Sequence, residues 1–166
     1  RGVLAVYKQD HEESLYRRGL YSFIKLTVPP PVMGMFDASN RDQCEVKRLQ
    51  TNTPLQALIM MNDPAVLEAS RVLAQNLSIE KSTTTEKITK AFRLIICRKP
   101  TEKEIKLLSD YYNEQLQSFQ QKKLNAASTL KVGEYELNEK IDKIQLASLM
   151  KLINIIYNME ESIMKT

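Results

Sequence analysis

Two helix starts that follow each other closely are the feature that most constrains this chain. In the first, the Thr53 hydroxyl can cap the helix, Pro54 takes the first helical position, and Gln56 can reach back to the Thr53 amide. In the second, Asp63 is placed to cap a helix that Pro64 begins. Apolar residues at helical spacing follow both starts. The pattern predicts a short helix and then a longer helix that turns away from it.

Similar signals predict further helices on both sides of this pair. Three prolines at 29–31 end an apolar-faced segment that begins at Ser14, because proline lacks the N–H and disfavours a helical residue before it. Capping boxes at 83–86 and 101–104 open two more helices, and Asn138 can cap the last one. The predicted helices cover about residues 14–28, 53–62, 63–77, 83–99, 101–125 and 138–164. The last helix is apolar on two faces, so we expect it to be central and buried on both.

The predicted fold is therefore all-α, an irregular bundle of about six helices with one long ordered loop at 29–52 and a connector at 126–137. The chain has 166 residues, of which 43% are hydrophobic and only four are glycine, which suits one helical domain with a real core. We expect residues 1–13 to be a polar N-terminal extension or the broken edge of a missing part, and 14–166 to be a single helical domain. No apolar run approaches membrane-spanning length, and no signal-peptide pattern is present. The chain begins at Arg1, so we expect it to be cut from a longer protein.

The charge distribution argues against nucleic acid as a partner. The net charge is +4, from 24 basic and 20 acidic side chains that are interspersed along most of the chain. Nucleic-acid binders usually show a basic stripe or a recognisable module. The nearest approach to such a stripe is Arg41, Lys47 and Arg48, which Asp42 and Glu45 dilute. We therefore expect a solvated or internally paired loop here and no nucleic-acid partner.

Cysteine and histidine usage gives no basis for a metal or cofactor site. Cys44 and Cys97 are too few for a disulfide scaffold and lack metal-ligand spacing. A bridge between them is open if the protein is exported, but we favour two small buried side chains. His11, the single histidine, lies in a polar segment that resembles a solvated linker. The Cys-x-x-Cys-His pattern of c-type haem attachment is absent, so we expect no metal and no cofactor.

The loop at 29–52 holds the one concentration of chemically reactive side chains. Asp37, Asp42 and Glu45 could supply acid or base groups, and Arg41 and Arg48 could tune their pKa or bind an anion. Oxygen ligands in this loop could also suit calcium, although the EF-hand spacing is absent. A charge-paired network that fixes the loop is the interpretation that we favour over catalysis. The candidate network, functional or structural, comprises Arg18, Asp37, Arg41, Asp42, Cys44, Glu45, Arg48 and Asn52.

We expect the same loop to be rigid. The three prolines restrict φ where it begins, and apolar side chains (Met33, Met35 and Phe36) can anchor it on the bundle. Its backbone polar groups then need partners. Asp37, Ser39, Asn40 and Asn52 can supply these through turn-type hydrogen bonds.

Residues in and around the loop also resemble a known family. The resemblance rests on 16–21 (YRRGLY), 28–31 (VPPP), 36–38 (FDA), Arg41, Cys44, Arg48, 51–58 (TNTPLQAL) and 73–74 (LA). These residues resemble the planctomycete-type secreted family, and the similarity extends more weakly from about Tyr16 to the C-terminus. In that family the segment is a C-terminal domain of unknown function in large proteins that often carry planctomycete cytochrome c domains upstream. The resemblance implies export to the periplasm or cell surface and upstream domains as partners, with any haem in another domain, but it implies no activity.

Two function classes follow. The first is a non-catalytic structural or interaction domain of a large exported protein, with a further protein, electron-transfer or polysaccharide partner. The alternative is part of an enzyme site, again polysaccharide-related, built on the 37–48 loop together with the missing upstream part. Strongly perturbed carboxylates in an open cleft would favour the enzyme, whereas mutually paired groups would favour the scaffold. We favour the first.

Overall fold

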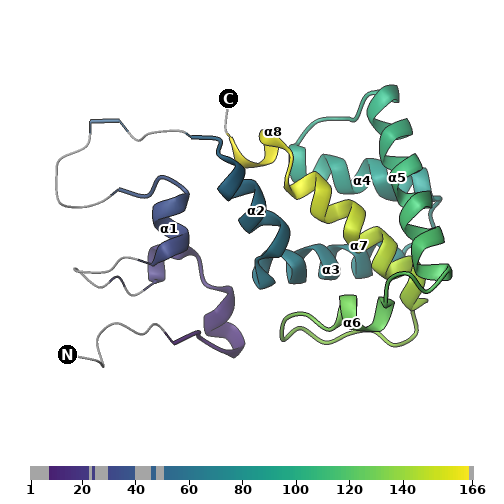
Figure 1. Ribbon diagram of the computed structural model, residues 1–166, viewed down its shortest axis with the longest axis horizontal. Helices are drawn as coiled ribbons and strands as arrows, with labels where there is room; N and C mark the ends of the chain where they lie inside the picture. The colour runs from purple at the N-terminus through teal and green to yellow at the C-terminus, as the bar shows by residue number, and fades with distance from the viewer. Residues whose placement is uncertain (1–7, 23, 25–29, 40–45, 48–50, 165–166) are drawn as a thin grey trace. The chain divides into compact units, whose positions relative to one another are not determined.

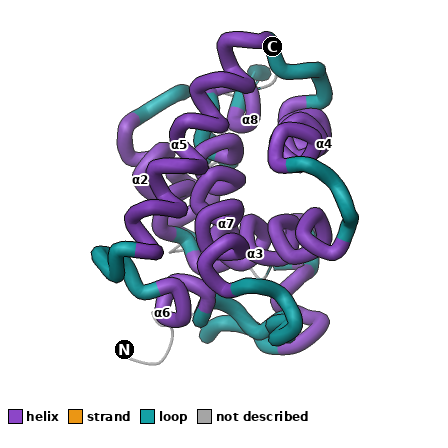
Figure 2. The backbone as a smooth tube through the Cα atoms, turned by 90° about the vertical axis from the view of Figure 1, so that its right-hand side faces the viewer, coloured by secondary structure: helices purple, strands orange, loops and turns teal. Residues whose placement is uncertain are grey.

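The computed structural model describes residues 8–22, 24, 30–39, 46–47 and 51–164. Within these ranges every regular element is a helix and none is a strand, as Figures 1 and 2 show. Two short 3-10 helices, η1 (Glu12–Tyr16) and η2 (Gly19–Tyr21), come first. The α-helices are α1 (Pro31–Met35), α2 (Pro54–Asn62), α3 (Pro64–Ile79), α4 (Thr84–Ile96), α5 (Glu102–Gln120), α6 (Ala126–Leu130), α7 (Lys143–Tyr157) and α8 (Glu160–Ile163). The all-α prediction is confirmed.

The backbone divides into two compact units, Arg1–Gln56 and Ala57–Thr166. The first unit contains the two 3-10 helices and α1, and the second contains α3 to α8. The predicted division into an extension at 1–13 and one domain at 14–166 stays a prediction. No helix of the described ranges combines the length and the apolar composition that crossing a membrane requires.

Helix α7 is the centre of the second unit. It contacts α3, α4, α5, α6 and α8, and Figure 1 shows it with these neighbours around it. Its buried residues follow one another almost without a gap: Leu146, Ala147, Ser148, Leu149, Met150, Leu152, Ile153, Asn154 and Ile156. A helix covered on one face alone would alternate buried and exposed residues. The prediction that the last long helix is central and buried on two sides is therefore confirmed.

The predicted caps at the starts of α3, α4 and α5 are present. The Thr83 and Thr101 hydroxyls each accept from the backbone amide of a glutamate three residues on, and the side chain of that glutamate accepts from the threonine amide. Asp63 accepts from the amides of Ala65 and Val66 at the start of α3. These helices begin where the sequence predicts because the caps satisfy amides that lack a partner inside the helix.

The first predicted helix, at 14–28, is wrong in its described part. Arg17 and Arg18 are extended, with ψ near 145° and 148°, and they separate η1 from η2. Gly19 follows them, and a Cβ at this position would lie 3.2 Å from the terminal methyl of Met33. A glycine that a methionine side chain covers so closely serves packing rather than a helix, which it would weaken by about 1 kcal/mol.

The C-terminal third also differs from the prediction. Helix α5 ends at Gln120 rather than near 125, and α6 lies in the segment predicted to be a connector, with Asn125 as its cap. The last predicted helix is divided into α7 and α8. Asp142 caps α7 by accepting from the Gln145 amide, whereas the Asn138 side chain accepts from Lys140, only two residues on. Asn138 therefore makes a turn and does not start the helix.

The expectation that Cys97 is buried is wrong. Cys97 is a free, exposed thiol that follows the last turn of α4 in the left-handed conformation, with φ of 63°. Its amide donates to the Arg93 carbonyl oxygen. A residue at this position closes the helix end rather than packing in the core. Cys44, the other cysteine, lies outside the described residues.

Candidate functional site

The loop network that the sequence predicts is described only in part. Arg41, Asp42, Cys44, Glu45 and Arg48 lie outside the described residues. Arg18 is exposed and precedes η2, where its carbonyl oxygen accepts from Tyr21. Asn52 is exposed as well, and Asp37 is half-buried. Asp37 is the member for which the structure gives side-chain geometry.

Asp37 follows a short helix that the sequence did not predict. α1 lies within the predicted loop, and Asp37 has a positive φ of 56° just after it. The Ala38 amide donates to the Met33 carbonyl oxygen at 3.0 Å, across the end of the helix. This bond from the second residue past the cap closes a Schellman motif, in which a left-handed residue follows the helix. Aspartate tolerates that conformation better than most residues do.

The Asp37 side chain is held by Thr51, which lies 14 residues further along the chain. The Thr51 amide donates to Asp37 Oδ2 at 2.8 Å, and the Thr51 hydroxyl lies 2.8 Å from Oδ2 and 3.0 Å from Oδ1. Gln56 then donates from Nε2 to the Thr51 hydroxyl at 3.0 Å and to the Met35 carbonyl oxygen at 2.7 Å. Gln56 Oε1 accepts from the Thr53 amide, which completes the predicted capping box.

Gln56 is therefore the centre of this cluster, although it was predicted only to cap a helix. Its side chain is 1% exposed, and both its amide nitrogen and its oxygen are satisfied. The cluster joins the end of α1 to the start of α2. The bonds between the Asp37 side chain and Thr51, 14 residues further along, are not the turn-type bonds that the sequence predicts, and Thr51 and the second role of Gln56 were missed. Nothing in the spacing of a polar loop singles them out.

A second cluster, which sequence reasoning also missed, lies on α3. Glu68, Arg71 and Gln75 are 4%, 1% and 7% exposed, although all three are polar or charged. Their spacing of three and four residues places them on one face of the helix. We call them the α3 polar row. From sequence alone this row looks like an ordinary solvated helix face.

The α3 polar row binds the backbone of the loop at 132–138. Arg71 donates from Nε to the Val132 carbonyl oxygen at 3.2 Å and from Nη2 to the Tyr135 carbonyl oxygen at 2.6 Å. The Tyr135 amide donates to Glu68 Oε1 at 2.6 Å. Glu68 Oε1 also lies 3.7 Å from Arg71 Nη2, which makes a buried ion pair. Each of the two charged side chains therefore hydrogen-bonds the loop backbone and forms an ion pair with the other.

The rest of the loop follows the same pattern. Gln75 donates to the Glu136 carbonyl oxygen at 3.4 Å and accepts from the Asn138 amide at 3.1 Å. Gly133 has a φ of 75°, and a Cβ built on it would lie 2.0 Å from Glu68 Cδ. The loop can lie against Glu68 only because residue 133 has no side chain.

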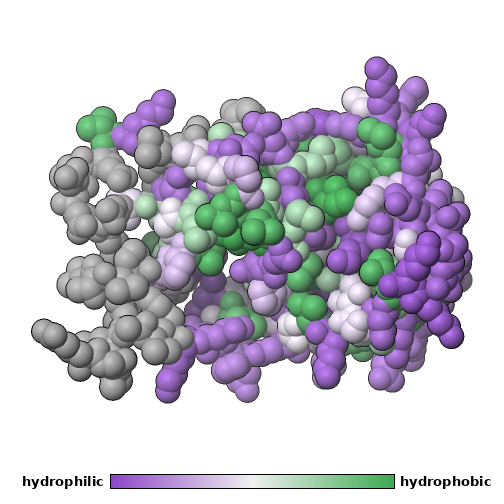
Figure 3. Space-filling view, viewed as in Figure 1, coloured by the Kyte–Doolittle hydropathy of each residue, from purple (hydrophilic) through white to green (hydrophobic). Residues whose placement is uncertain are grey.

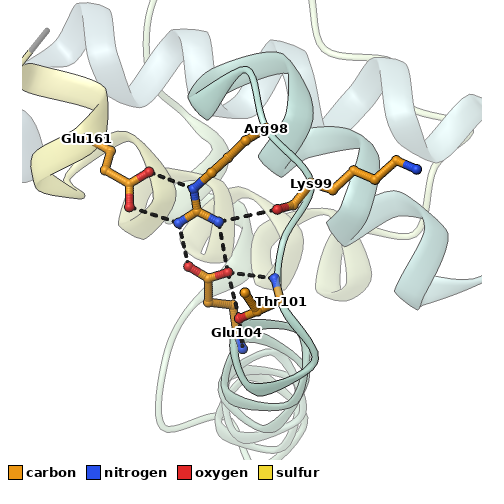
Figure 4. A network of polar contacts seen from close by, with 5 residues as sticks. All are labelled: Arg98, Lys99, Thr101, Glu104 and Glu161. Atoms are coloured by element: carbon orange, nitrogen blue, oxygen red, sulfur yellow. Dashed lines mark hydrogen bonds and ion pairs between the residues drawn. The ribbon is translucent and has the colours of Figure 1, made fainter. Parts of the chain in front are cut away.

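A third cluster, shown in Figure 4, surrounds Arg98 in the turn after α4. Its Nε and Nη2 donate to the two carboxylate oxygens of Glu161 on α8, at 2.7 and 2.8 Å. Its Nη1 and Nη2 donate to Glu104 on α5, at 3.0 and 2.6 Å. Glu104 also caps α5 by accepting from the Thr101 amide. The Arg98 guanidinium lies over the buried Phe92 ring, 4.8 Å from its centroid.

Arg98 changes the titration of both carboxylates. Its hydrogen bonds, together with those from Thr101, lower the pKa of Glu104 to about 2, and its hydrogen bonds lower the pKa of Glu161. Glu161 and then Glu104 raise the pKa of Arg98. All three groups are charged at neutral pH, so the arrangement holds α5 and α8 at the end of α4. The cluster is not suited to general acid or base catalysis, because a group in that role needs a pKa near the working pH.

Ligands for a metal are not grouped in the part of the chain that the structure describes. No three histidine, cysteine, aspartate or glutamate side chains lie together there in a way that could hold an ion. The three clusters instead share one chemistry, in which polar side chains fix turns, loops and helix ends.

Comparison with known proteins identifies a family but no activity. The model of the family described as "PSD1: Protein of unknown function (DUF1553)" matches residues 3–112. No curated protein matches the chain, and no solved structure matches it. The family match covers more than half of the 166 residues and includes the run at 51–58 on which the expected resemblance rests. It begins before residue 16 and ends well before the C-terminus, so its extent differs from the expected one. The chain belongs to this family of proteins of unknown function.

Proposed function

We propose that this chain is a non-catalytic structural or interaction domain at the C-terminal end of a large exported multidomain protein. The resemblance of residues 16–64 supports a planctomycete-type secreted parent protein with cytochrome c domains upstream. It supports a periplasmic or cell-surface location in the same way. The first partners of the chain are then the upstream domains of its parent protein. A second protein or a polysaccharide is a further proposed partner.

The use of Glu68 and Arg71 carries this proposal. Both side chains are buried, and their polar atoms bond the backbone of Val132 and Tyr135. A catalytic group must reach the reacting atoms of a substrate in a plausible pose. Charged groups that are buried and hydrogen-bonded to the backbone instead hold the loop in a single conformation. This is the chemistry of a scaffold.

Helix α2 offers the surface for contact with the upstream domains. Leu58 and Met61 lie three residues apart in the part of α2 that belongs to the second unit, and they are 56% and 48% exposed. Figure 3 shows apolar side chains gathered over α2. An apolar surface of this kind suits burial against another apolar surface. We assign the upstream domains to it because the resemblance implies them as the nearest partners.

Methionine oxidation tests the assignment within one molecule. Met61 is 48% exposed and Met150 is 1% exposed, so peroxide should oxidise Met61 and spare Met150 in the isolated chain. In the full-length parent protein, Met61 should become protected, and Met150 should stay unreactive as the internal control. Equal oxidation of Met61 in the isolated chain and in the parent would contradict the proposal that α2 contacts the upstream domains.

The alternative proposal, an enzyme site on the 37–48 loop, has weaker support. Thr51 engages both carboxylate oxygens of Asp37, so this carboxylate is hydrogen-bonded within the chain. The other ionisable residues named for that site, Arg41, Asp42, Glu45 and Arg48, lie outside the described residues. The alternative therefore rests on the sequence pattern of the loop.

A further inference from the structure

A groove runs along the outward face of α4. Its volume is about 560 Å³, and the described residues that line it all belong to this helix: Thr85, Glu86, Thr89, Lys90, Arg93 and Leu94. We call these six residues the α4 outer face. They lie opposite the buried Ile88, Ala91 and Phe92, which pack into the core. Figure 2 shows α4 at the edge of the second unit.

Two charged side chains of the α4 outer face have capacity left for a partner. Arg93 is exposed, and no hydrogen bond or ion pair in the described part of the chain uses its guanidinium. Glu86 is exposed too. Its Oε2 accepts from the Thr83 amide, and its Oε1 has no hydrogen bond within the described residues. Lys90, in contrast, already forms an ion pair with Glu80. The face therefore offers one positive and one negative group, seven residues apart.

This arrangement of charges suits a second copy of the same chain. A partner of one charge sign would be attracted by one of the two groups and repelled by the other. When two copies of α4 pack antiparallel about a two-fold axis between positions 89 and 90, residue 86 of each copy faces residue 93 of the other. These positions are seven residues apart, about two helical turns, so both lie on the side toward the partner. Lys87, the other charged residue of α4, is half-buried at the edge of the face. Glu86 and Arg93 can therefore pair twice across the axis.

We propose that the α4 outer face is the contact surface of a weak symmetric dimer, in which Glu86 and Arg93 of one copy pair with Arg93 and Glu86 of the other. Lys90 lies near the axis and faces its own counterpart, and the ion pair with Glu80 offsets its charge. Leu94, which is 57% exposed, and the aliphatic stems of Lys90 and Arg93 supply the apolar part of the contact. One helix face buries less than the roughly 1,200–2,000 Å² of a stable interface, so the dissociation constant should be roughly 0.1–1 mM.

Sedimentation equilibrium of the full 166-residue chain tests for this dimer. At low micromolar concentration, as in an unfolding experiment, the average mass should be that of the monomer, 19.1 kDa. It should rise well above this value as the concentration approaches about 1 mM. Added sodium chloride should weaken the association, because the ion pairs across the axis are close to solvent. A monomeric mass over the whole concentration range would overturn the proposal.

Two charge reversals identify the surface. Arg93→Glu should weaken self-association at least about tenfold, because it places two carboxylates against each other across the axis. Glu86→Lys should do the same by placing two cations together. An equimolar mixture of the two variants should associate about as well as the unmodified chain, because each variant retains the residue that complements the substitution in the other. Self-association of either variant at the unmodified level, or failure of the mixture to associate, would overturn the assignment to α4.

Two further variants separate the contact from net charge and from folding. Lys103→Glu changes the net charge as Arg93→Glu does, but on α5, and should leave the association unchanged. An equal loss of association in these two variants would show that net charge is responsible and would overturn the proposal. Because Glu86 also caps α4, circular dichroism must show that Glu86→Lys is folded. Glu86→Gln keeps a side chain that can cap and should still weaken the association several-fold, and undiminished association of this variant would contradict the Glu86–Arg93 pairs.

Discussion

Arg71 and Arg98 lie in the same unit, and each makes several hydrogen bonds to other segments of the chain. Arg71 is buried, whereas Arg98 is partly exposed. The Arg71 side chain is 1% exposed, whereas that of Arg98 is 37% exposed. Arg71 bonds two backbone carbonyl oxygens and has one buried carboxylate beside it. Arg98 bonds two carboxylates, those of Glu104 and Glu161, and both are partly open to solvent.

The difference predicts that burial, rather than the number of ion pairs, decides how much each arginine contributes to the stability of the fold. Loss of one partner from a buried pair leaves the other as an uncompensated charge in a poor solvent. At an exposed site, water and salt replace much of the lost interaction. The better hydrogen-bonded arginine, Arg98, should therefore be the less important one for stability.

Removal of the buried guanidinium should have the largest effect. Arg71→Met should lower the free energy of unfolding by about 3–5 kcal/mol, because it leaves Glu68 charged and the Val132 and Tyr135 carbonyl oxygens unpaired. Arg93→Met is the matched control, since Arg93 is exposed on α4. Urea unfolding measures both variants. Equal losses for Arg71→Met and Arg93→Met would contradict the structural role of the buried arginine.

Replacement of the glycine that faces Glu68 should come next. Gly133→Ala should cost roughly 1–3 kcal/mol for the positive φ alone, with a further loss because the new methyl group meets the Glu68 carboxylate. Gly34→Ala serves as the control: Gly34 lies in α1, and a Cβ there has open space around it. Alanine at 34 should be neutral or stabilising by roughly 0.5–1 kcal/mol. Similar losses at both glycines would show that the contact with Glu68 has no special role.

Removal of the exposed arginine should have a smaller effect that depends on salt. Arg98→Met should destabilise the chain less than Arg71→Met does, because solvent reaches Arg98 and its partners. The loss of unfolding free energy in Arg98→Met should shrink as the sodium chloride concentration is raised, whereas the loss in Arg71→Met should stay nearly constant. The comparison would fail if Arg98→Met were the more damaging change, or if both deficits responded to salt alike.

The pH dependence of the exposed network should be the subtlest effect. The pKa of Glu104 is lowered from 4.5 to about 2 in the folded chain, so the unfolded chain binds the proton first as pH falls. The stabilisation by Glu104 is therefore complete above pH 4.5 and is lost progressively toward pH 2. Glu104→Gln should flatten this part of the stability curve, which thermal unfolding at a series of pH values measures. An unchanged acid limb in Glu104→Gln would contradict the assignment.

The helix starts were predictable because each depends on residues within four positions of one another. Thr83, Thr101 and Asp63 act on amides of the turn that they open, so sequence spacing alone identifies them. The central position of α7 was predictable from its two apolar faces. The predicted start of the last helix at Asn138 was wrong because an asparagine can make a turn as readily as a cap. The residue that caps α7, Asp142, follows only four residues later.

The clusters were not predictable because their partners are far apart in the sequence. Arg71 and Tyr135 are separated by 64 residues, and Arg98 and Glu161 by 63. A buried arginine that bonds loop carbonyls has the same sequence signature as a solvated arginine on a helix face. Of the candidate loop network, Asp37 was expected to make turn-type hydrogen bonds, and its bonds to Thr51, 14 residues further along, were not foreseen.

Amide hydrogen exchange at Tyr135 and Asn138 tests most directly the claim that the α3 polar row gives the loop one structure. These two amides donate to side chains, Glu68 and Gln75, rather than to helix carbonyls. If the row holds the loop as described, both amides should be protected to nearly the same degree as the buried amides of α7, and Arg71→Met should abolish that protection. Exchange of Tyr135 and Asn138 at the rate of an unfolded peptide in the unmodified chain would contradict the account.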